Sequence, residues 1–86
     1  MIKVNPSIVF REELEGWGVL FDPDTGESHG LNAVSVLIWK GLESGMSKDD
    51  ILAGIAERVD GDLPPEASSD FDEFVEVLMD KGYISA

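Results

Sequence analysis

Cysteine is absent from the 86 residues, and the chain has only one histidine and six basic residues. The lack of cysteine excludes disulfides, thiolate metal sites and cysteine nucleophiles. One histidine cannot form a histidine-rich metal site, and the longest apolar runs, such as residues 36–39, are far too short to span a membrane. We therefore expect no metal or other cofactor. The N-terminus also lacks the apolar core of a signal peptide, so we expect a cytoplasmic protein.

Positive charge is also scarce. Eighteen acidic residues against six basic ones give a net charge of −12. Binding to nucleic acid or to an anionic membrane normally requires clustered lysine and arginine. Here the six basic residues are scattered along the chain, so neither partner is expected, and a protein or peptide with some basic character fits better. Solubility alone is also a sufficient reason for such acidity.

The chain is long enough for one domain, residues 1–86, and its apolar periodicity changes near residue 32. Alternating apolar residues predict strands at residues 7–13 and 17–22. The sequence Asp-Pro-Asp-Thr-Gly at residues 22–26 predicts a hairpin turn, because proline presets φ and glycine accepts a positive φ. A short third strand at residues 27–31 then follows mainly from that turn.

Residues 32–82 instead show the helical period. Asn32 predicts a helix N-cap, Ser47 opens a second helix, and Ser69 with Asp72 forms a capping signature for a third. Phe71 and Phe74 of the third helix are interpreted as core residues. They belong to a broad apolar face that also leaves surplus surface for a partner, and its centre is formed by Phe71, Phe74, Val75 and Leu78. Tyr83 follows in a short extended tail. Three strands followed by three helices predict a small α+β domain, with a possible helix-turn-helix and the sheet as its wing.

Catalytic machinery is not evident. His29 lies near Ser28 and Asp22 in sequence, but a catalytic triad also requires convergence in space and an oxyanion hole. The paired carboxylates, such as Asp49 and Asp50, are explained by helix capping and the helix dipole. We therefore expect a protein that is not an enzyme.

The order of several short motifs matches a known pattern. These are Leu20-Phe21-Asp22-Pro23-Asp24-Thr25-Gly26-Glu27, Leu31-Asn32, Ile38-Trp39, Leu42, Gly45, Ser47, Ile51, Phe74, Leu78 and Gly82-Tyr83-Ile84. In this order and spacing the chain resembles the PqqD family, from Asn5 to its end. That family consists of small peptide chaperones of peptide-derived natural-product biosynthesis, and the module is also known as the RiPP recognition element.

The resemblance implies a winged-helix-like fold and a non-catalytic role. In the family, the leader of a precursor peptide adds as a strand to the third β-strand, in a groove beside the third helix. The module then presents the peptide to a modifying enzyme, often a radical SAM enzyme. Carried onto this chain, the implied peptide-binding residues are Glu27, Ser28, His29, Gly30, Leu31, Phe71, Val75, Leu78 and Met79.

The side of the third helix that faces the peptide stays open at this point. Val75 and Met79 lie on one flank, and Val77 on the other is the alternative. Two other functions also stay open. A winged-helix DNA-binding regulator shares the helix-turn-helix pattern but conflicts with the net charge of −12. An interaction subunit for another enzyme, such as a kinase or ligase component, suits the acidic surface equally well.

Overall fold

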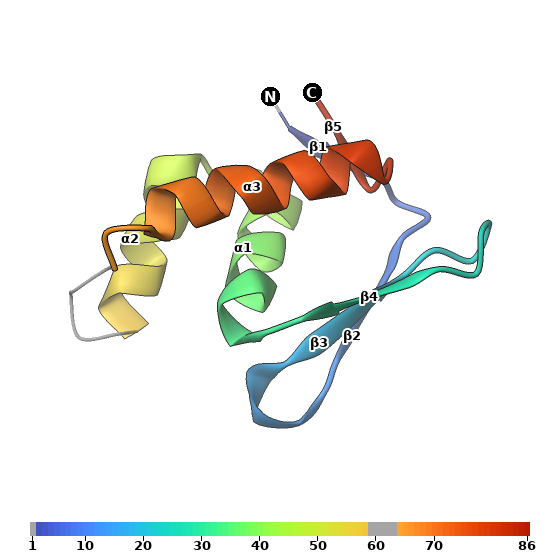
Figure 1. Ribbon diagram of the computed structural model, residues 1–86, viewed down its shortest axis with the longest axis horizontal. Coiled ribbons are helices and arrows are strands. Elements are labelled where there is room, and N and C mark those ends of the chain that lie inside the picture. The colour runs from blue at the N-terminus through green and yellow to red at the C-terminus, as the bar shows by residue number, and fades with distance from the viewer. Residues whose placement is uncertain (1, 59–63) are drawn as a thin grey trace.

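The computed structural model describes residues 2–58 and 64–86, in which most strands precede the helices (Figure 1). The elements are β1 (Lys3–Val4), β2 (Val9–Glu12), the 3₁₀ helix η1 (Leu14–Gly16), β3 (Gly18–Phe21), β4 (Ser28–Leu31), α1 (Ala33–Glu43), α2 (Lys48–Arg58), α3 (Ala67–Asp80) and β5 (Ile84–Ser85). The predicted α+β class is confirmed. No helix in the described ranges is long and apolar enough to cross a membrane.

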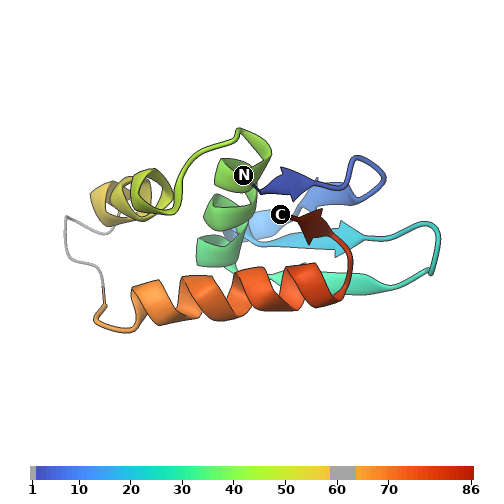
Figure 2. The ribbon, with the colours of Figure 1, turned by 90° about the horizontal axis from the view of Figure 1, so that it is seen from above.

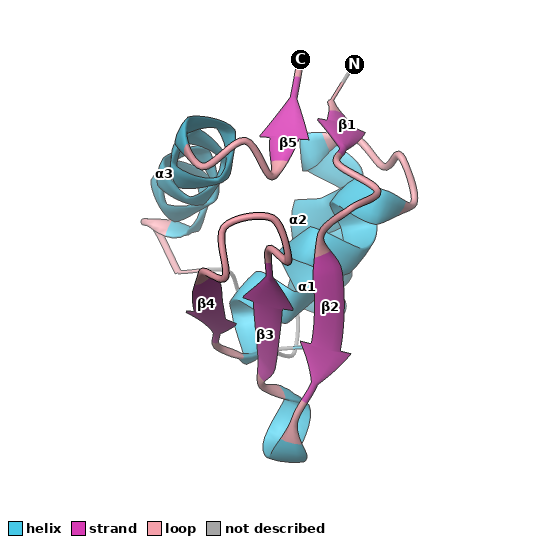
Figure 3. Ribbon diagram, turned by 90° about the vertical axis from the view of Figure 1, so that its right-hand side faces the viewer, coloured by secondary structure: helices cyan, strands magenta, loops and turns pink. Residues whose placement is uncertain are grey.

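The central feature is a three-stranded antiparallel sheet in the order β2-β3-β4. Leu20 in the middle strand lies opposite Phe10 on one side and His29 on the other. Val9 lies opposite Phe21, and these two side chains belong to the other face of the sheet. Both β2 and β4 are therefore edge strands, and Figure 3 shows β4 on the side of α3.

The hairpin turn between β3 and β4 is formed by the residues predicted for it. Asp22 accepts the Gly26 N–H at its carbonyl, at 2.8 Å, and the Asp24 N–H at its side chain, at 2.9 Å. Gly26 has φ of 79°, which residues other than glycine rarely adopt. The predicted turn is confirmed, and it fixes where β4 begins.

Two of the three predicted helix starts are confirmed. The Asn32 side chain accepts the Ser35 N–H at 2.8 Å, and the Ser47 hydroxyl accepts the Asp50 N–H at 3.2 Å. The third prediction is wrong, because α3 begins two residues before Ser69. The Ser69 hydroxyl instead donates to the Glu66 carbonyl at 3.0 Å, the local bond that serine makes inside a first turn.

The C-terminal tail pairs with a strand that the sequence did not reveal. In β5, Ile84 lies opposite Val4 of β1, so the two ends of the described chain are neighbours (Figure 1). Asn5 extends this join, since its N–H donates to the Tyr83 carbonyl at 2.9 Å. The pair ties the C-terminal end of α3 to the segment that enters β2.

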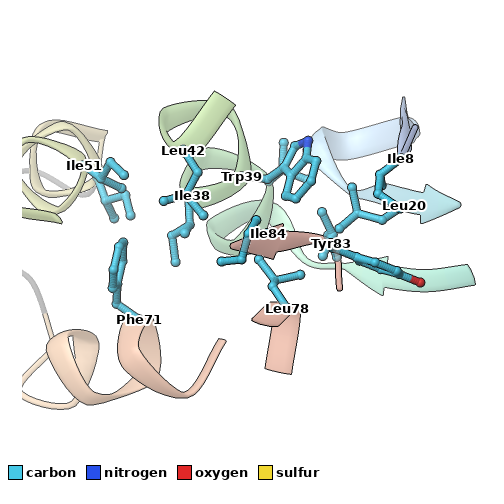
Figure 4. Packing of buried hydrophobic residues seen from close by; sticks show 13 residues of the cluster. Ile8, Leu20, Ile38, Trp39, Leu42, Ile51, Phe71, Leu78, Tyr83 and Ile84 are labelled. Atoms are coloured by element: carbon cyan, nitrogen blue, oxygen red, sulfur yellow. The ribbon is translucent and has the colours of Figure 1, made fainter. Parts of the chain in front are cut away.

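The core lies between the sheet, α1 and α3 (Figure 4). Trp39, Leu20 and Leu78 have no exposed side-chain surface. Gly18 permits the close approach of α1 to the sheet, because a Cβ there would lie 2.7 Å from Phe10 and 3.0 Å from Val36. Helix α1 thus covers one face of the sheet, and α3 runs beside β4 (Figure 2).

Candidate functional site

Strand β4 has one hydrogen-bonded side and one open side. The Asp22 N–H donates to the Glu27 carbonyl at 2.9 Å, which makes these two residues a hydrogen-bonded pair. Such pairs alternate along an antiparallel ladder, so His29 and Leu31 also bond to β3. The N–H and C=O groups of Ser28 and Gly30 therefore point away from β3. In the described part of the chain no strand pairs with this side, which we call the open edge.

Side chains of the β4 segment and of α3 meet beside the open edge. The His29 and Phe74 ring centres are 6.4 Å apart, and a Glu27 carboxylate oxygen lies 3.8 Å from the Lys81 ammonium. Glu27 and His29 reach α3 together because they lie two residues apart in extended chain and share a face. These four residues form the junction at which the resemblance implies a peptide groove, and we call it the β4–α3 groove. Its middle is formed by the two rings, and its end is charged.

A cavity lies near this junction, where β4 passes into α1. This cavity has a volume of about 380 Å³, and Phe74 borders both the cavity and the groove. Its lining comes from the start of α1, from α2 and from the first half of α3, and it is mostly apolar: Asn32, Val34, Ser35, Ile38, Leu52, Ile55, Pro64, Ala67, Asp70 and Phe74. An extended peptide that follows β4 therefore has apolar surface beside it and beyond it.

Helix geometry indicates which flank of α3 borders the groove. At about 100° per residue, Lys81 is displaced from Phe74 by only about 20°, and Val77 by about 60° in the same direction. Val75 and Met79 are displaced by about 100° and 140° in the opposite direction. The contacts of Phe74 and Lys81 with β4 therefore place the flank of Val77 nearer the groove.

The structure divides the implied peptide-binding residues into three groups. Ser28, His29 and Gly30 lie in β4, Glu27 directly precedes it, and all four are at least partly accessible. Leu31, Phe71 and Leu78 are buried, so they can shape the site from beneath but offer little surface to a ligand. Val75 and Met79 lie on the flank of α3 that is turned away from β4.

Two groove residues, Phe74 and Lys81, are missing from the implied set. The sequence placed Phe74 in the core, but its ring is only partly buried and contacts His29. The spacing could have linked the two, because residues seven apart share a helix face. What the sequence could not show is that this face meets β4.

The electrostatics favour a neutral histidine in the groove. Burial, together with the Lys81 ammonium, lowers the pKa of His29 below its ordinary value of 6.5. At the same end of the sheet, burial and the carboxylates of Glu27 and Asp22 raise the pKa of the Tyr83 phenol. Both rings are thus uncharged near neutral pH, as suits contact with apolar peptide side chains.

The charged side chains offer little to a phosphate backbone. Lys48 lies 3.0 Å from an Asp72 oxygen, and Arg11, Lys40 and Lys81 also pair with carboxylates. In the ranges that the structure describes, no three histidine or carboxylate side chains are grouped to hold a metal ion. What the described residues do offer is the open edge of β4 beside the Phe74 ring.

Comparisons with known proteins agree with this geometry. Residues 18–84 match the family model described as "Coenzyme PQQ synthesis protein D (PqqD)". The chain is 26% identical to the solved structure "TbiB1 in Complex with the TbiA(beta) Leader Peptide", with a TM-score of 0.79 over 98% of this chain and 95% of that one. It is also 26% identical to "Lasso peptide synthetase B1 complexed with the leader peptide", with a TM-score of 0.78 over 99% and 98%. No curated protein matches the chain.

Proposed function

Because the chain belongs to the PqqD family, we propose that it is a RiPP recognition element that binds the leader of a ribosomal precursor peptide and presents it to a modifying enzyme. The role is non-catalytic, since binding and presentation need only the edge and the groove. Support comes from the two similar structures, which are described as complexes with leader peptides.

The observation that carries the proposal is the open edge of β4 beside Phe74 of α3, which also borders a mostly apolar cavity. A peptide strand can pair with the outward N–H and C=O groups of Ser28 and Gly30, which supplies affinity with little dependence on sequence. Alternate peptide side chains then point toward α3. There they meet Phe74, Val77 and Lys81, which supply selectivity.

The proposed site thus differs in part from the residues implied by the resemblance. Residues 27–30 remain the β4 side of the proposed site. On the α3 side, Phe74 and Val77 take the contact role that Val75 and Met79 had. Leu31, Phe71 and Leu78 hold the two sides in place from the core.

An NMR titration tests this docking mode. The ligand is the leader of the precursor peptide encoded beside the gene of this chain, and a scrambled peptide of the same composition is the control. We expect amide shifts in residues 27–31 and near Phe74, Val77 and Lys81. Shifts confined to α2, or equal shifts with the scrambled peptide, would contradict strand addition at β4.

The DNA-binding alternative has no support from the family model or the similar structures. The net charge of −12 and the pairing of four cations with carboxylates also disfavour it. In a gel-shift assay with operator DNA from the same gene cluster we expect no salt-sensitive complex. A specific complex at physiological salt would revive the regulator.

A further inference from the structure

The face of the sheet that points away from α1 carries an exposed apolar patch. In β3 and the residue before it, Trp17, Val19 and Phe21 alternate with the buried Gly18 and Leu20. Trp17 is 54% exposed and Phe21 is 40% exposed, whereas Leu20 on the opposite face is fully buried. With Val9, which lies opposite Phe21 and is 50% exposed, these side chains form what we call the outer patch. Figure 3 shows the three strands in front of α1.

Carboxylates border the outer patch at both ends. Glu13 and Glu15 lie beside Trp17, and Asp22 and Asp24 follow Phe21 in the hairpin turn. Arg11 is the one cation on this face of β2, and its guanidinium lies 3.7 Å from Glu13. Exposed apolar surface with a polar rim is characteristic of a protein interaction site. A second copy of this chain, itself at −12, would bring carboxylates against carboxylates, so the rim favours a partner with lysine and arginine around an apolar centre.

The outer patch is continuous with the open edge of β4. Only Ser28 and Gly30 point outward from β4 on this face, and a Cβ on Gly30 would meet no atom within 4 Å. Because Ser28 and Gly30 are small, they do not cover the outer face of the sheet between Val19 and the open edge. A peptide strand added there would direct every second side chain onto this same face. One flat surface would then contain both the outer patch and half of the peptide side chains.

We propose that the outer patch is the docking surface for the modifying enzyme, which meets it with an apolar surface bordered by basic residues and contacts the outward side chains of the bound leader at the same time. This inference rests on the proposed leader-binding function. It implies reciprocal coupling, because each ligand adds contact surface for the other. The leader should therefore raise the affinity of the enzyme, and the enzyme should raise the affinity of the leader by the same factor.

The test compares Phe21→Ser with a matched control, Met46→Ser. Met46 is 42% exposed, close to Phe21, but lies between α1 and α2 rather than on the sheet. The probes are the purified modifying enzyme and the leader peptide encoded beside the gene of this chain. Calorimetry measures each binary affinity and the affinity of the enzyme for the leader-saturated domain.

We expect Phe21→Ser to weaken enzyme binding by about tenfold or more, as for an aromatic residue at the centre of an interface. Leader binding should change less than about twofold, and Met46→Ser should change neither affinity. If Phe21→Ser does not fold, Val9→Ser tests the same patch, with a smaller expected loss of enzyme affinity.

Four results would overturn the inference. Unchanged enzyme affinity in the patch variants, with normal leader binding, overturns the docking surface alone. Failure of the wild-type domain to bind the leader overturns the proposed function as well. Failure of the enzyme to bind the leader-saturated wild-type domain overturns the docking surface. A wild-type dimer in sedimentation that Phe21→Ser dissociates assigns the outer patch to a second copy.

Discussion

The two edges of the sheet differ in how they treat an approaching strand. Within β2, Arg11 and Glu12 carry full charges, and Glu13 follows directly. Within β4 the sequence is Ser-His-Gly-Leu, which has no full charge near neutral pH and no proline. Charged side chains on an edge strand disfavour pairing with another chain. The first edge is therefore protected against strand addition, and the second is left available for it.

The elements around each edge strengthen this difference. On the β2 side, Lys40 of α1 reaches out to bond with Glu12, and its ammonium lies 5.9 Å from the centre of the Phe10 ring. On the β4 side, α3 presents Phe74 beside a mostly apolar cavity. An open edge supplies main-chain affinity, and the adjacent helix supplies side-chain selectivity. Only β4 combines the two.

The strongest test removes one outward donor from the open edge. In Gly30→Pro, the lost N–H faces away from β3, so the β3–β4 ladder keeps its bonds. A bound leader would be left with an unsatisfied carbonyl, a cost of about 1–3 kcal/mol, and would also meet the proline ring. We expect leader affinity, measured by calorimetry, to fall by about a hundredfold.

Two variants serve as controls for this substitution. Gly30→Ala keeps the donor and places its methyl group in open space, so leader binding should persist. Glu12→Pro makes the same change on the other edge, where the alternation of pairs also leaves the N–H of residue 12 outward. If Glu12→Pro weakened leader binding as much as Gly30→Pro, the distinction between the edges would be lost.

The second test decides between the flanks of α3. Val77 is 39% exposed and Met79 is 37% exposed, so an aspartate at either position has a similar cost for folding. Val77→Asp places a charge beside the β4–α3 groove, where it would be desolvated by a bound leader. We expect about a tenfold loss of leader affinity for Val77→Asp and little change for Met79→Asp. The reverse order would restore the flank of Val75.

The third test concerns the junction that fixes the end of β4. Asn32 caps α1 directly after this strand, so Asn32→Ala should lower the free energy of unfolding by about 0.5–2 kcal/mol. Ser69→Ala is the matched control, since Ser69 caps no helix and should change stability by less than about 0.5 kcal/mol. Urea melts measure both. Equal losses would mean that the Asn32 cap contributes nothing specific.

These tests also mark how far the sequence alone could reach. The hairpin turn and the Asn32 cap were predicted because each depends on residues within a few positions of one another. The first two strands were predicted from the alternation of apolar residues, although β2 and β3 are each shorter than predicted. The third helix was also predicted, but Ser69, its predicted N-cap, lies three residues after the observed N-cap, Glu66.

What the sequence could not supply depends on distant partners. Which N–H and C=O groups of β4 point outward depends on how its residues alternate in pairing with β3. This alternation does not depend on the residue type, so the sequence does not reveal it. The flank of α3 that borders β4 follows from tertiary packing, as does the pairing of β5 with β1. Trp39 shows the same limit, because only the packing of α1 against the sheet reveals that it is completely buried.

The smallest expected effect is a dependence of stability and of leader affinity on pH, which arises from His29 in β4. Burial and Lys81 lower the pKa of His29, so the unfolded chain binds more protons than the folded one below pH 6.5. The contribution of His29 to the free energy of unfolding is therefore fully present above pH 6.5. It is lost as the pH decreases toward the pKa of the folded state. A leader in the groove would bury the imidazole further and lower this pKa again, so leader binding should weaken in the same direction.

His29 is the only histidine, so its ring protons can be followed by NMR without ambiguity. We expect a midpoint below 6.5, a rise toward 6.5 in Lys81→Met, and a further decrease with leader bound. A midpoint above 6.5 would mean that the Glu27 carboxylate outweighs both causes.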